Sequence, residues 1–327
     1  MFEVLRIAPL SSVQDAGRLQ WRALGVPLAG PLDDWSHAVA NMLVGNPNPS
    51  AALEIGFGRS EFLFERPALI ALTGARANVF AGSVALPRWR PVQIAAGTRV
   101  RIDPARDGQR VYLAVAGGFD TALVLGSRSS SPGAGIGVEV LTRGQRLNLT
   151  SKSDRLGQLL PPGSPPRCAN WWVDAEPLLD LEGGAALRLM TGSHVGLLAN
   201  PYAPYTQDFG LSRASNRMAA PLLGAPLSVS NAAELVSEPV FPGTLQLPPD
   251  GLPVLLLADA QTIGGYPRIG HLAAVDLARI AQRRPDSKIR FEPIGVEAAR
   301  RLWIWRRQRL ARMAIAVSAR LHEILLR

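Results

Sequence analysis

The chain has 327 residues, of which 47% are hydrophobic and 19% charged, and this balance predicts a folded globular protein rather than a disordered one. Its single cysteine, Cys168, excludes an internal disulfide framework and a metal site built from several cysteines. The formal net charge of +9 raises the question of a nucleic-acid partner, but no nucleic-acid-binding motif is present and we expect none. We see no run of about eighteen apolar residues and no signal peptide, so we expect a cytoplasmic protein without a membrane span.

Short apolar segments separated by glycine and proline predict a mainly β fold. The chain holds 31 glycines and 27 prolines, which is high for a helical protein. Strands are expected over residues 2–7, 68–75, 91–102 and 110–118 in the first half, and over residues 187–192, 243–247, 253–259 and 288–291 in the second. One short helix is predicted in each half, over residues 35–44 after the N-cap signal of Asp33 and Asp34, and over residues 276–282.

A stretch rich in proline, glycine and serine divides the chain. We therefore expect a first domain over residues 1–150, a linker over residues 151–184, a second domain over residues 185–293 and a C-terminal helix over residues 294–327. Trp171 and Trp172 are expected to hold part of the linker against a domain surface.

The C-terminal segment carries most of the net charge. Residues 297–327 hold eight arginines and two glutamates, interleaved with apolar residues that include Leu302, Trp303, Trp305 and Leu310. At helical spacing this pattern predicts a basic amphipathic helix. Such a helix could pack on its own protein or on a partner subunit, which we favour, and it could also lie on an anionic membrane or on RNA.

The most informative segment is a polar turn that follows a predicted buried strand. The apolar run of residues 255–258 predicts the strand, and the residues that could bind a small polar ligand follow it: Gln261, Thr262, Gly264, Gly265, Tyr266 and Arg268. The first two hydrogen-bond without titrating, and the glycines allow a positive φ or a close approach of the backbone to another group. Tyr266 adds a ring and Arg268 a permanent cation. The alternative is a tight turn that binds nothing.

Other polar residues at predicted turns are candidates for substrate binding. They are Ser127 and Arg128, the trio Ser215, Asn216 and Arg217, and the single residues Glu238, Gln246 and Asp33. A hydroxyl beside a guanidinium could hold a carboxylate or a phosphate, but the same residue types also stabilise ordinary turns. The four histidines are scattered without metal-ligand spacing, so we predict no metal site.

Four blocks of sequence resemble a known family. They are VQDAGRLQWRALGVPLAGPLDDWSHAVANMLVGNP (13–47), YLAVAGGFDTALVLGSRS (112–129), ELVSEPVFPGTLQLPPDGLPVLLLAD (234–259) and the segment 261–291, which begins QTIGGYPRIG. In this order they resemble the family of biotin-dependent carboxyltransferases and 5-oxoprolinase C subunits, also called allophanate hydrolase subunit 2. The resemblance implies two cyclophilin-like β-barrel domains in tandem, in keeping with the predicted strands.

The resemblance also implies a reaction. One branch of the family works with A-like and B-like partner subunits as an ATP-dependent 5-oxoprolinase, which opens 5-oxoproline to glutamate. The other branch transfers a carboxyl group from carboxybiotin to urea or another amide. In either case we expect this chain to bind no cofactor alone and to act on a small amide. Backbone N–H groups of Gly264 and Gly265, with Arg268 or Arg217, would then stabilise charge on the substrate oxygen, while Gln261 and Thr262 orient the amide.

Three positions depart from the family pattern. Asn216 replaces an acid, Ala219 replaces a glycine and Ala260 replaces an arginine. The glycine-rich stretch after Ser129 is also shorter than is usual. The loss of a cation and a carboxylate near the expected site leaves open a different substrate, or a non-catalytic regulatory subunit that binds a partner.

Overall fold

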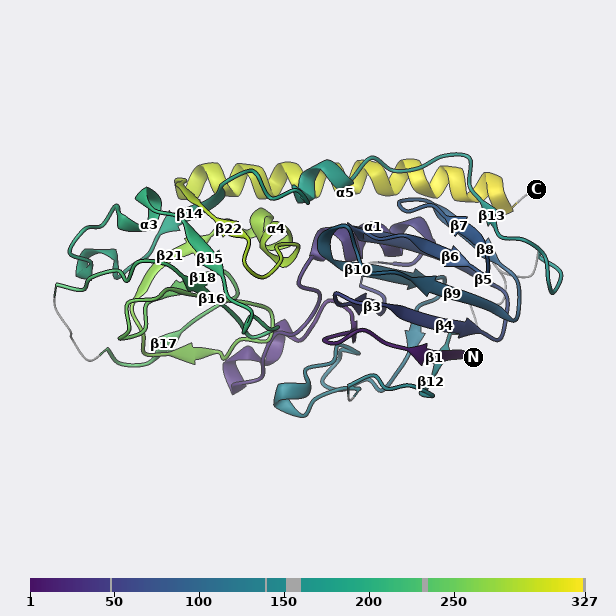
Figure 1. Ribbon diagram of the computed structural model, residues 1–327, viewed down its shortest axis with the longest axis horizontal. Helices are drawn as coiled ribbons and strands as arrows, with labels where there is room; N and C mark the ends of the chain where they lie inside the picture. The colour runs from purple at the N-terminus through teal and green to yellow at the C-terminus, as the bar shows by residue number, and fades with distance from the viewer. Residues whose placement is uncertain (48, 139, 151–159, 231–234, 326–327) are drawn as a thin grey trace.

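The computed structural model describes residues 1–327 except 48, 139, 151–159, 231–234 and 326–327. Two β-rich halves lie side by side, and the long helix α5 (Val296–Leu325) runs along one side of both (Figure 1). The predicted fold class, mainly β with two barrel-like domains, short helices and a basic C-terminal helix, is confirmed.

The first half is built from two antiparallel sheets. One sheet has seven strands, in the order β11 (Phe119–Asp120), β12 (Arg146–Leu149), β1 (Phe2–Arg6), β4 (Ser60–Phe64), β9 (Thr98–Ile102), β6 (Val79–Ala81) and β7 (Val84–Leu86). The other has six, in the order β13 (Arg167–Cys168), β8 (Pro91–Ile94), β5 (Ala68–Arg76), β10 (Asp107–Val115), β3 (Ala52–Ile55) and β2 (Ser12–Gln14). Their inward side chains form one core, in which the ring of Phe2 lies 4.9 to 5.1 Å from those of Phe62, Phe64 and Phe119.

The second half is built around one large sheet. Its eight strands follow the order β22 (Lys288–Ile289), β15 (Phe209–Leu211), β16 (Ala219–Leu223), β19 (Val254–Leu256), β18 (Thr244–Gln246), β21 (Arg268–Leu272), β14 (Leu187–Thr191) and β23 (Phe291–Pro293). The pairing of β14 with β23 is parallel, and the other described pairings of this sheet are antiparallel. A separate two-stranded ribbon joins β17 (Glu238–Pro239) to β20 (Ile263–Gly264).

Short helices connect these strands. They are η1 (Leu19–Leu24), α1 (Asp34–Leu43), η2 (Pro132–Ala134), η3 (Glu176–Leu179), η4 (Val195–Leu197), α3 (Ala203–Thr206), η5 (Ala274–Asp276) and α4 (Leu277–Ala281). The helices predicted over residues 35–44 and 276–282 correspond to α1 and α4. Asp33 is the N-cap of α1, because its Oδ1 accepts a hydrogen bond from the Ser36 backbone N–H at 2.9 Å.

The segment predicted as a linker is largely attached to the first half. Residues 151–159 lie outside the described residues, but β13 pairs with β8 at the edge of the six-stranded sheet. Trp171 packs against a core cluster that also contains Leu179, whereas Trp172 is 63% exposed. The described part is therefore a structured strap and not a free connector, and only the first of the two tryptophans is packed as expected.

Helix α5 packs on its own chain. Val317 and Leu321 are buried in the same hydrophobic cluster as Trp35 and Leu43 of α1. Arg306 is buried under the helix, where it forms an ion pair with Asp34 and its guanidinium lies 5.7 Å from the ring centre of Trp35. No helix in the described ranges combines the length and the apolar character that a bilayer crossing requires.

Candidate functional site

A cavity of about 490 Å³ lies between the two halves, which is within the size range of small-molecule sites. The first half contributes Leu10, Ser11, Ser12, Gly25, Pro27, Ser131, Pro132, Gly133, Ala134 and Val140. The second half contributes Asn216, Arg217, Met218, Asp259 and Gln261. Most of the wall is apolar, and the polar groups capable of fixing a ligand are concentrated on the side of the second half.

Arg217 crosses from the second half into the first. Its Nη1 donates to Glu54 Oε1 at 2.5 Å, and its Nη2 donates to the Gly30 carbonyl oxygen at 2.6 Å and to Asp259 Oδ1 at 2.8 Å. Its Nε donates to Asp259 Oδ2 at 3.1 Å. Two carboxylates therefore hold this buried guanidinium, and every nitrogen is engaged. The expectation that Arg217 stabilises charge on a substrate does not fit this geometry, because its donors already serve the protein.

Glu54 is the acceptor at the centre of this network. The Tyr112 hydroxyl donates to its Oε2 at 2.6 Å, and the Leu32 backbone N–H donates to the same oxygen at 2.8 Å. Arg110 Nε lies 3.7 Å from Oε1. Burial alone would raise the pKa of Glu54, but the two arginines and the hydrogen bonds outweigh it and hold the pKa below its ordinary value. Glu54 is thus an ionised anchor between the halves.

Asp33 is also buried at the junction, but among the described residues it forms no ion pair with an arginine. Its Oδ2 accepts from the Ser36 hydroxyl at 2.6 Å and from Gln282 Nε2 at 2.7 Å. The side-chain oxygen Oε1 of Gln282 in turn accepts from the backbone N–H groups of Gln109 and Arg110 at 3.0 and 2.9 Å. Burial raises the pKa of Asp33 to about 6. Asp33 was predicted to bind substrate, but it is fully enclosed and instead caps a helix and joins the halves.

Ser127 and Arg128 bind a carboxylate of the protein itself. The Ser127 hydroxyl donates to Asp15 Oδ1 at 2.5 Å, and the Arg128 backbone N–H donates to Asp15 Oδ2 at 2.6 Å. Arg128 Nη2 also pairs with Asp120 at 2.9 Å. Burial would raise the pKa of Asp15, but these hydrogen bonds lower it. The chemistry predicted for this turn is present, although the anion that it holds is Asp15 and not a substrate.

The predicted catalytic turn is divided between two places. Gln261 lines the cavity, and its side chain is exposed and forms no hydrogen bond with the described residues. Thr262 uses its carbonyl oxygen to accept from the Val240 N–H at 3.0 Å. Tyr266 is 49% exposed and lies outside the cavity lining. Arg268 pairs with Glu238, and its Nη1 donates to the Pro239 carbonyl oxygen at 3.2 Å, so this cation is already neutralised.

The two glycines of the turn serve the ribbon of β17 and β20. Gly264 pairs with Glu238, and a Cβ at this position would lie 2.7 Å from the side-chain nitrogen of Gln246. The close approach expected of a glycine is therefore real, but the group that approaches is Gln246. Gly265 lies near Leu235 and Ser237 of the same region. Among the described residues, this second group does not share the cavity lining with Gln261.

The positions that depart from the family pattern have different surroundings. Asn216 lines the cavity, and its Oδ1 accepts from the backbone N–H groups of Met218 and Ala219 at 2.7 and 3.2 Å. Its Nδ2 forms no hydrogen bond with the described residues, so it can donate to a ligand. Ser215 donates to the Ser212 carbonyl oxygen at 2.7 Å and closes a local turn. Ala260 is fully buried, next to Asp259 in sequence but outside the cavity wall.

Several residues of the site were not anticipated. They are Asp15, Glu54, Arg110, Tyr112 and Asp259, and each is charged or polar within a buried position. The available signal was an acid inside an apolar strand segment, as in the run AALEIG around Glu54, because a buried carboxylate requires a partner. In the part of the chain described, no cluster of three or more His, Cys, Asp or Glu side chains is placed to hold a metal ion.

The profile of the family described as carboxyltransferase domain, subdomain A and B, matches residues 24–293, so the chain belongs to this family. It is 35% identical over 302 residues to the C subunit of 5-oxoprolinase from Escherichia coli K12, and the match covers 91% of this chain and 93% of the relative. The corresponding C subunit of Haemophilus influenzae is 28% identical, with coverage of 92% and 94%.

Larger proteins contain a matching region. Urea amidolyase of Saccharomyces cerevisiae is 26% identical over 89% of this chain, but the match spans only 16% of that protein. The crystal structure of Kluyveromyces lactis urea carboxylase superposes with a TM-score of 0.82 at 25% identity, covering 94% of this chain and 29% of the other. The urea amidolyase structure from the same organism gives the same TM-score and identity, with 20% of its chain covered.

Proposed function

We propose that this chain is the C subunit of an ATP-dependent 5-oxoprolinase, which opens 5-oxoproline to glutamate together with A-like and B-like partner subunits. The main support for this proposal is how much of each chain the sequence match covers. The two 5-oxoprolinase C subunits match over more than nine-tenths of both chains, whereas the urea amidolyase relative of yeast contains the region as 16% of its length. The match therefore favours the 5-oxoprolinase branch, in which nearly the whole relative corresponds to this chain.

The inter-half cavity supplies groups suited to an amide. Opening a lactam breaks the ring C–N bond, joins the oxygen of water to the carbonyl carbon, and leaves a proton on the nitrogen. Negative charge develops on the carbonyl oxygen, where neutral amide donors such as Gln261 and Asn216 Nδ2 would stabilise it. The Asp259 carboxylate, held by Arg217 through both oxygens and facing the same cavity, would accept a hydrogen bond from the attacking water and orient it, while the proton of the water passes to the ring nitrogen.

The cavity does not suit a nucleoside triphosphate such as ATP. Arg217 is the single cation in its described lining, and all of its nitrogen atoms are engaged by Glu54, Asp259 and Gly30. A triphosphate requires several available cations or backbone donors. We therefore assign the use of ATP to the partner subunits and the binding of the small amide to this chain.

Carboxyl transfer is the second candidate, and the superposition on urea carboxylase favours it. Carboxybiotin would supply an activated carboxyl group for transfer to an amide nitrogen. Its ureido ring is a cyclic urea with an amide-like carbonyl, so Gln261 and Asn216 would hydrogen-bond it by the same neutral groups. The apolar wall formed by Leu10, Val140 and Met218 would contact its aliphatic part.

The test is glutamate release by the assembled complex. The chain would be co-expressed with its A-like and B-like partner subunits, and glutamate would be measured with 5-oxoproline and ATP present or omitted. Gln261→Ala is expected to lower kcat/KM about a hundredfold, on the scale of one lost transition-state donor. Gln207→Ala, at a half-buried glutamine of the same half outside the cavity, is the matched control.

Four outcomes separate the candidates. Glutamate formation that falls with Gln261→Ala and persists with Gln207→Ala supports the oxoprolinase and its site. Activity that is unaffected by Gln261→Ala would contradict the site. If a well-formed complex releases no glutamate but carboxylates an amide when supplied with carboxybiotin, carboxyl transfer is favoured. Inactivity in both assays would point to a regulatory subunit.

A further inference from the structure

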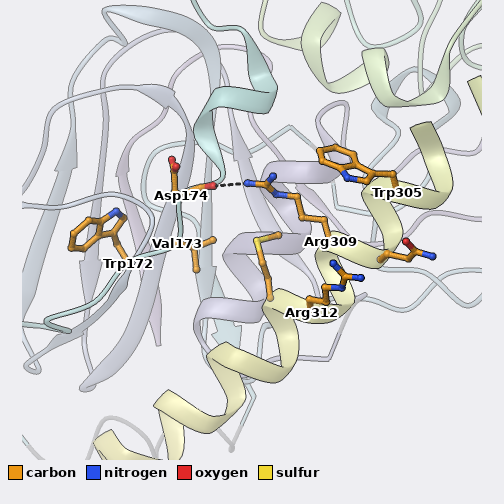
Figure 2. A pocket seen from close by; sticks show the side chains of 8 residues that line it. Trp172, Val173, Asp174, Trp305, Arg309 and Arg312 are labelled. Carbon is orange, nitrogen blue, oxygen red and sulfur yellow. Dashed lines mark hydrogen bonds between the residues drawn. The ribbon is translucent and has the colours of Figure 1, made fainter. Parts of the chain in front are cut away.

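A second concave surface lies on the outside of the molecule, beneath the edge of α5. This groove has a volume of about 430 Å³ and lies between residues 172–174 and the helix. Figure 2 shows Trp172 on one side, with Trp305, Arg309 and Arg312 on the other, and a hydrogen bond from Arg309 to the Asp174 backbone. We refer to it as the α5 groove. It shares no lining residue with the cavity between the halves.

The walls of the α5 groove expose large aromatic surfaces. Trp172 is 63% exposed and Trp305 is 47% exposed, and Met313 also lines the groove. Tryptophan, methionine and arginine are the residues enriched where proteins meet, and tryptophan and arginine carry much of the energy there. A solvent-exposed groove with two tryptophans has the composition of a protein–protein interface.

The charge of the groove is positive on balance, because Arg309 and Arg312 outweigh the single carboxylate of its lining, that of Asp174. Helix α5 contains seven arginines and two glutamates. Arg306 is paired with Asp34, but Arg307 and Arg312 form no ion pair with any residue that the structure describes. Arg309 donates to a backbone carbonyl and not to a carboxylate. These exposed guanidinium groups complement an anionic partner, because arginine binds carboxylates through two parallel hydrogen bonds.

The groove lies at the boundary of the family match. The family profile ends at residue 293 and α5 begins at Val296, so one wall of the groove lies beyond the profile. In the urea carboxylase structure, the matching region is 29% of a longer chain.

We propose that the α5 groove docks an acidic segment of another subunit of the same complex, with an apolar side chain placed between Trp172 and Trp305 and carboxylates on Arg309 and Arg312. The proposal rests on the proposed function, which supplies the partner subunits. It adds which face of this chain they occupy and which chemistry recognises them.

Two other occupants fit the groove less well. RNA would need a basic surface that extends beyond the helix, but residues 1–296 hold 27 Lys and Arg against 24 Asp and Glu, and the sequence contains no nucleic-acid-binding motif. A membrane would take up the apolar face of an amphipathic helix, but part of that face, including Val317 and Leu321, is already buried against the first half. An acidic peptide needs only the concave groove and its rim of cations.

The experiment measures binding of the purified full-length chain to each of the purified partner subunits by titration calorimetry, at low and at high salt. Arg312→Glu and Trp172→Ala are each expected to weaken binding at low salt by about tenfold or more. The matched controls are Arg99→Glu, at an exposed arginine on β9, and Tyr202→Ala, at an aromatic that is 72% exposed in the second half. Both controls are expected to leave the affinity within about twofold of the wild type.

Each result bears on the proposal. Loss of affinity in the groove variants but not in the controls supports it, provided that thermal unfolding shows an unchanged fold. Should Trp172→Ala unfold the chain, the exposed Arg312→Glu variant decides the question. Equal effects in Arg312→Glu and Arg99→Glu, or none in either, would overturn docking at the groove. The absence of binding to both subunits would also overturn it. The same holds if the groove variants bind the subunits normally and lose only their binding to phosphatidylserine vesicles or to RNA.

Glutamate release in the same preparations separates this proposal from the proposed function. If the complex makes glutamate and Arg312→Glu binds the subunits as tightly as the wild type, the oxoprolinase function stands and docking at the α5 groove is contradicted. If the complex makes no glutamate but the groove variants lose affinity, docking at the α5 groove stands and the oxoprolinase function is contradicted.

Discussion

The arginines at the junction of the two halves and those on the outer side of α5 carry the same charge in opposite surroundings. Arg217 is buried and bonded to Glu54 and Asp259. Arg307 and Arg312 are exposed and form no ion pair within the described ranges. A buried guanidinium must be paired, because the loss of its hydration is costly, whereas an exposed one need not be. The junction arginines are thus engaged in holding the protein together, and those of α5 remain available to a partner.

The buried carboxylates at the junction repeat this comparison. Glu54 faces Arg217 and Arg110, and its pKa lies below the ordinary value despite burial. Asp33 accepts only neutral hydrogen bonds from Ser36 and Gln282, and burial raises its pKa to about 6. The pKa is thus lowered for the carboxylate that faces two arginines and raised for the one that forms only neutral hydrogen bonds.

Removal of the junction guanidinium is expected to have the largest effect. Arg217→Met would leave Glu54 and Asp259 buried without their cation, and we expect the free energy of unfolding to fall by about 3 to 5 kcal/mol. Urea denaturation followed by tryptophan fluorescence would measure this loss.

The control is Arg213→Met, at an arginine four positions away. Arg213 pairs with Asp286 at 2.7 Å, but its side chain is 81% exposed. We expect a change in unfolding free energy far smaller than that of Arg217→Met. Similar losses in the two variants would contradict the distinction between paired buried arginines and solvated ones.

The second prediction concerns pH. Because the folded-state pKa of Asp33 is raised to about 6 from 3.8, its contribution to stability is fully present below pH 3.8 and is lost as the pH rises through 6. The loss is about 3 kcal/mol. Asp33→Asn cannot ionise, so its stability relative to the wild type should increase between about pH 4 and 7. Denaturation of both proteins across this range measures the difference, which also cancels the titration of the other carboxyl groups.

The magnitude at any one pH is not the test, because the amide of the Asp33→Asn variant would lose hydrogen bonds to Gln282 and Ser36 while retaining a capping oxygen. The test is how the difference in unfolding free energy between the two proteins changes with pH. A difference between the two proteins that does not change with pH would show that Asp33 keeps its ordinary pKa at the junction.

A smaller loss is expected where α5 meets α1. Arg306→Met removes the ion pair with Asp34 and the contact with Trp35, and it should lower the free energy of unfolding by about 2 kcal/mol. Because Met retains most of the aliphatic stem, the loss would report the guanidinium. Circular dichroism during urea denaturation would measure it, and an unchanged stability would mean that Val317 and Leu321 hold the helix without this arginine.

The fold was accessible from the sequence because its signals are local. Glycine and proline between apolar runs predicted the strands, Asp33 marked the start of α1, and the spacing of Trp303, Leu310 and the arginines predicted α5. The strap of residues 167–181 was taken for a linker because its pairing with β8 depends on a partner some 75 residues away, and its own composition resembles that of free chain.

The site was only partly accessible, because its contacts join distant parts of the chain. Gln261 was identified at a polar turn, and it does line the cavity. Arg217 was identified as a cation, but its partner Glu54 lies 163 positions away, and a sequence does not show which carboxylate will neutralise which arginine. For the same reason the sequence did not show that Arg268 lies away from the cavity. Its ion pair with Glu238 exists only in the folded ribbon of β17 and β20.

The smallest effect is expected at Arg312. Because this side chain is exposed and unpaired within the described residues, Arg312→Ala should change the free energy of unfolding by less than about 0.5 kcal/mol, as measured by the denaturation used for Arg306→Met. The two arginines lie six residues apart on one helix, so a large loss at Arg306 and none at Arg312 would place the stabilising and the available charges on different sides of α5. A loss of about 2 kcal/mol at Arg312 would instead mean that it holds the groove wall in place, and its charge would then not be available to bind another subunit.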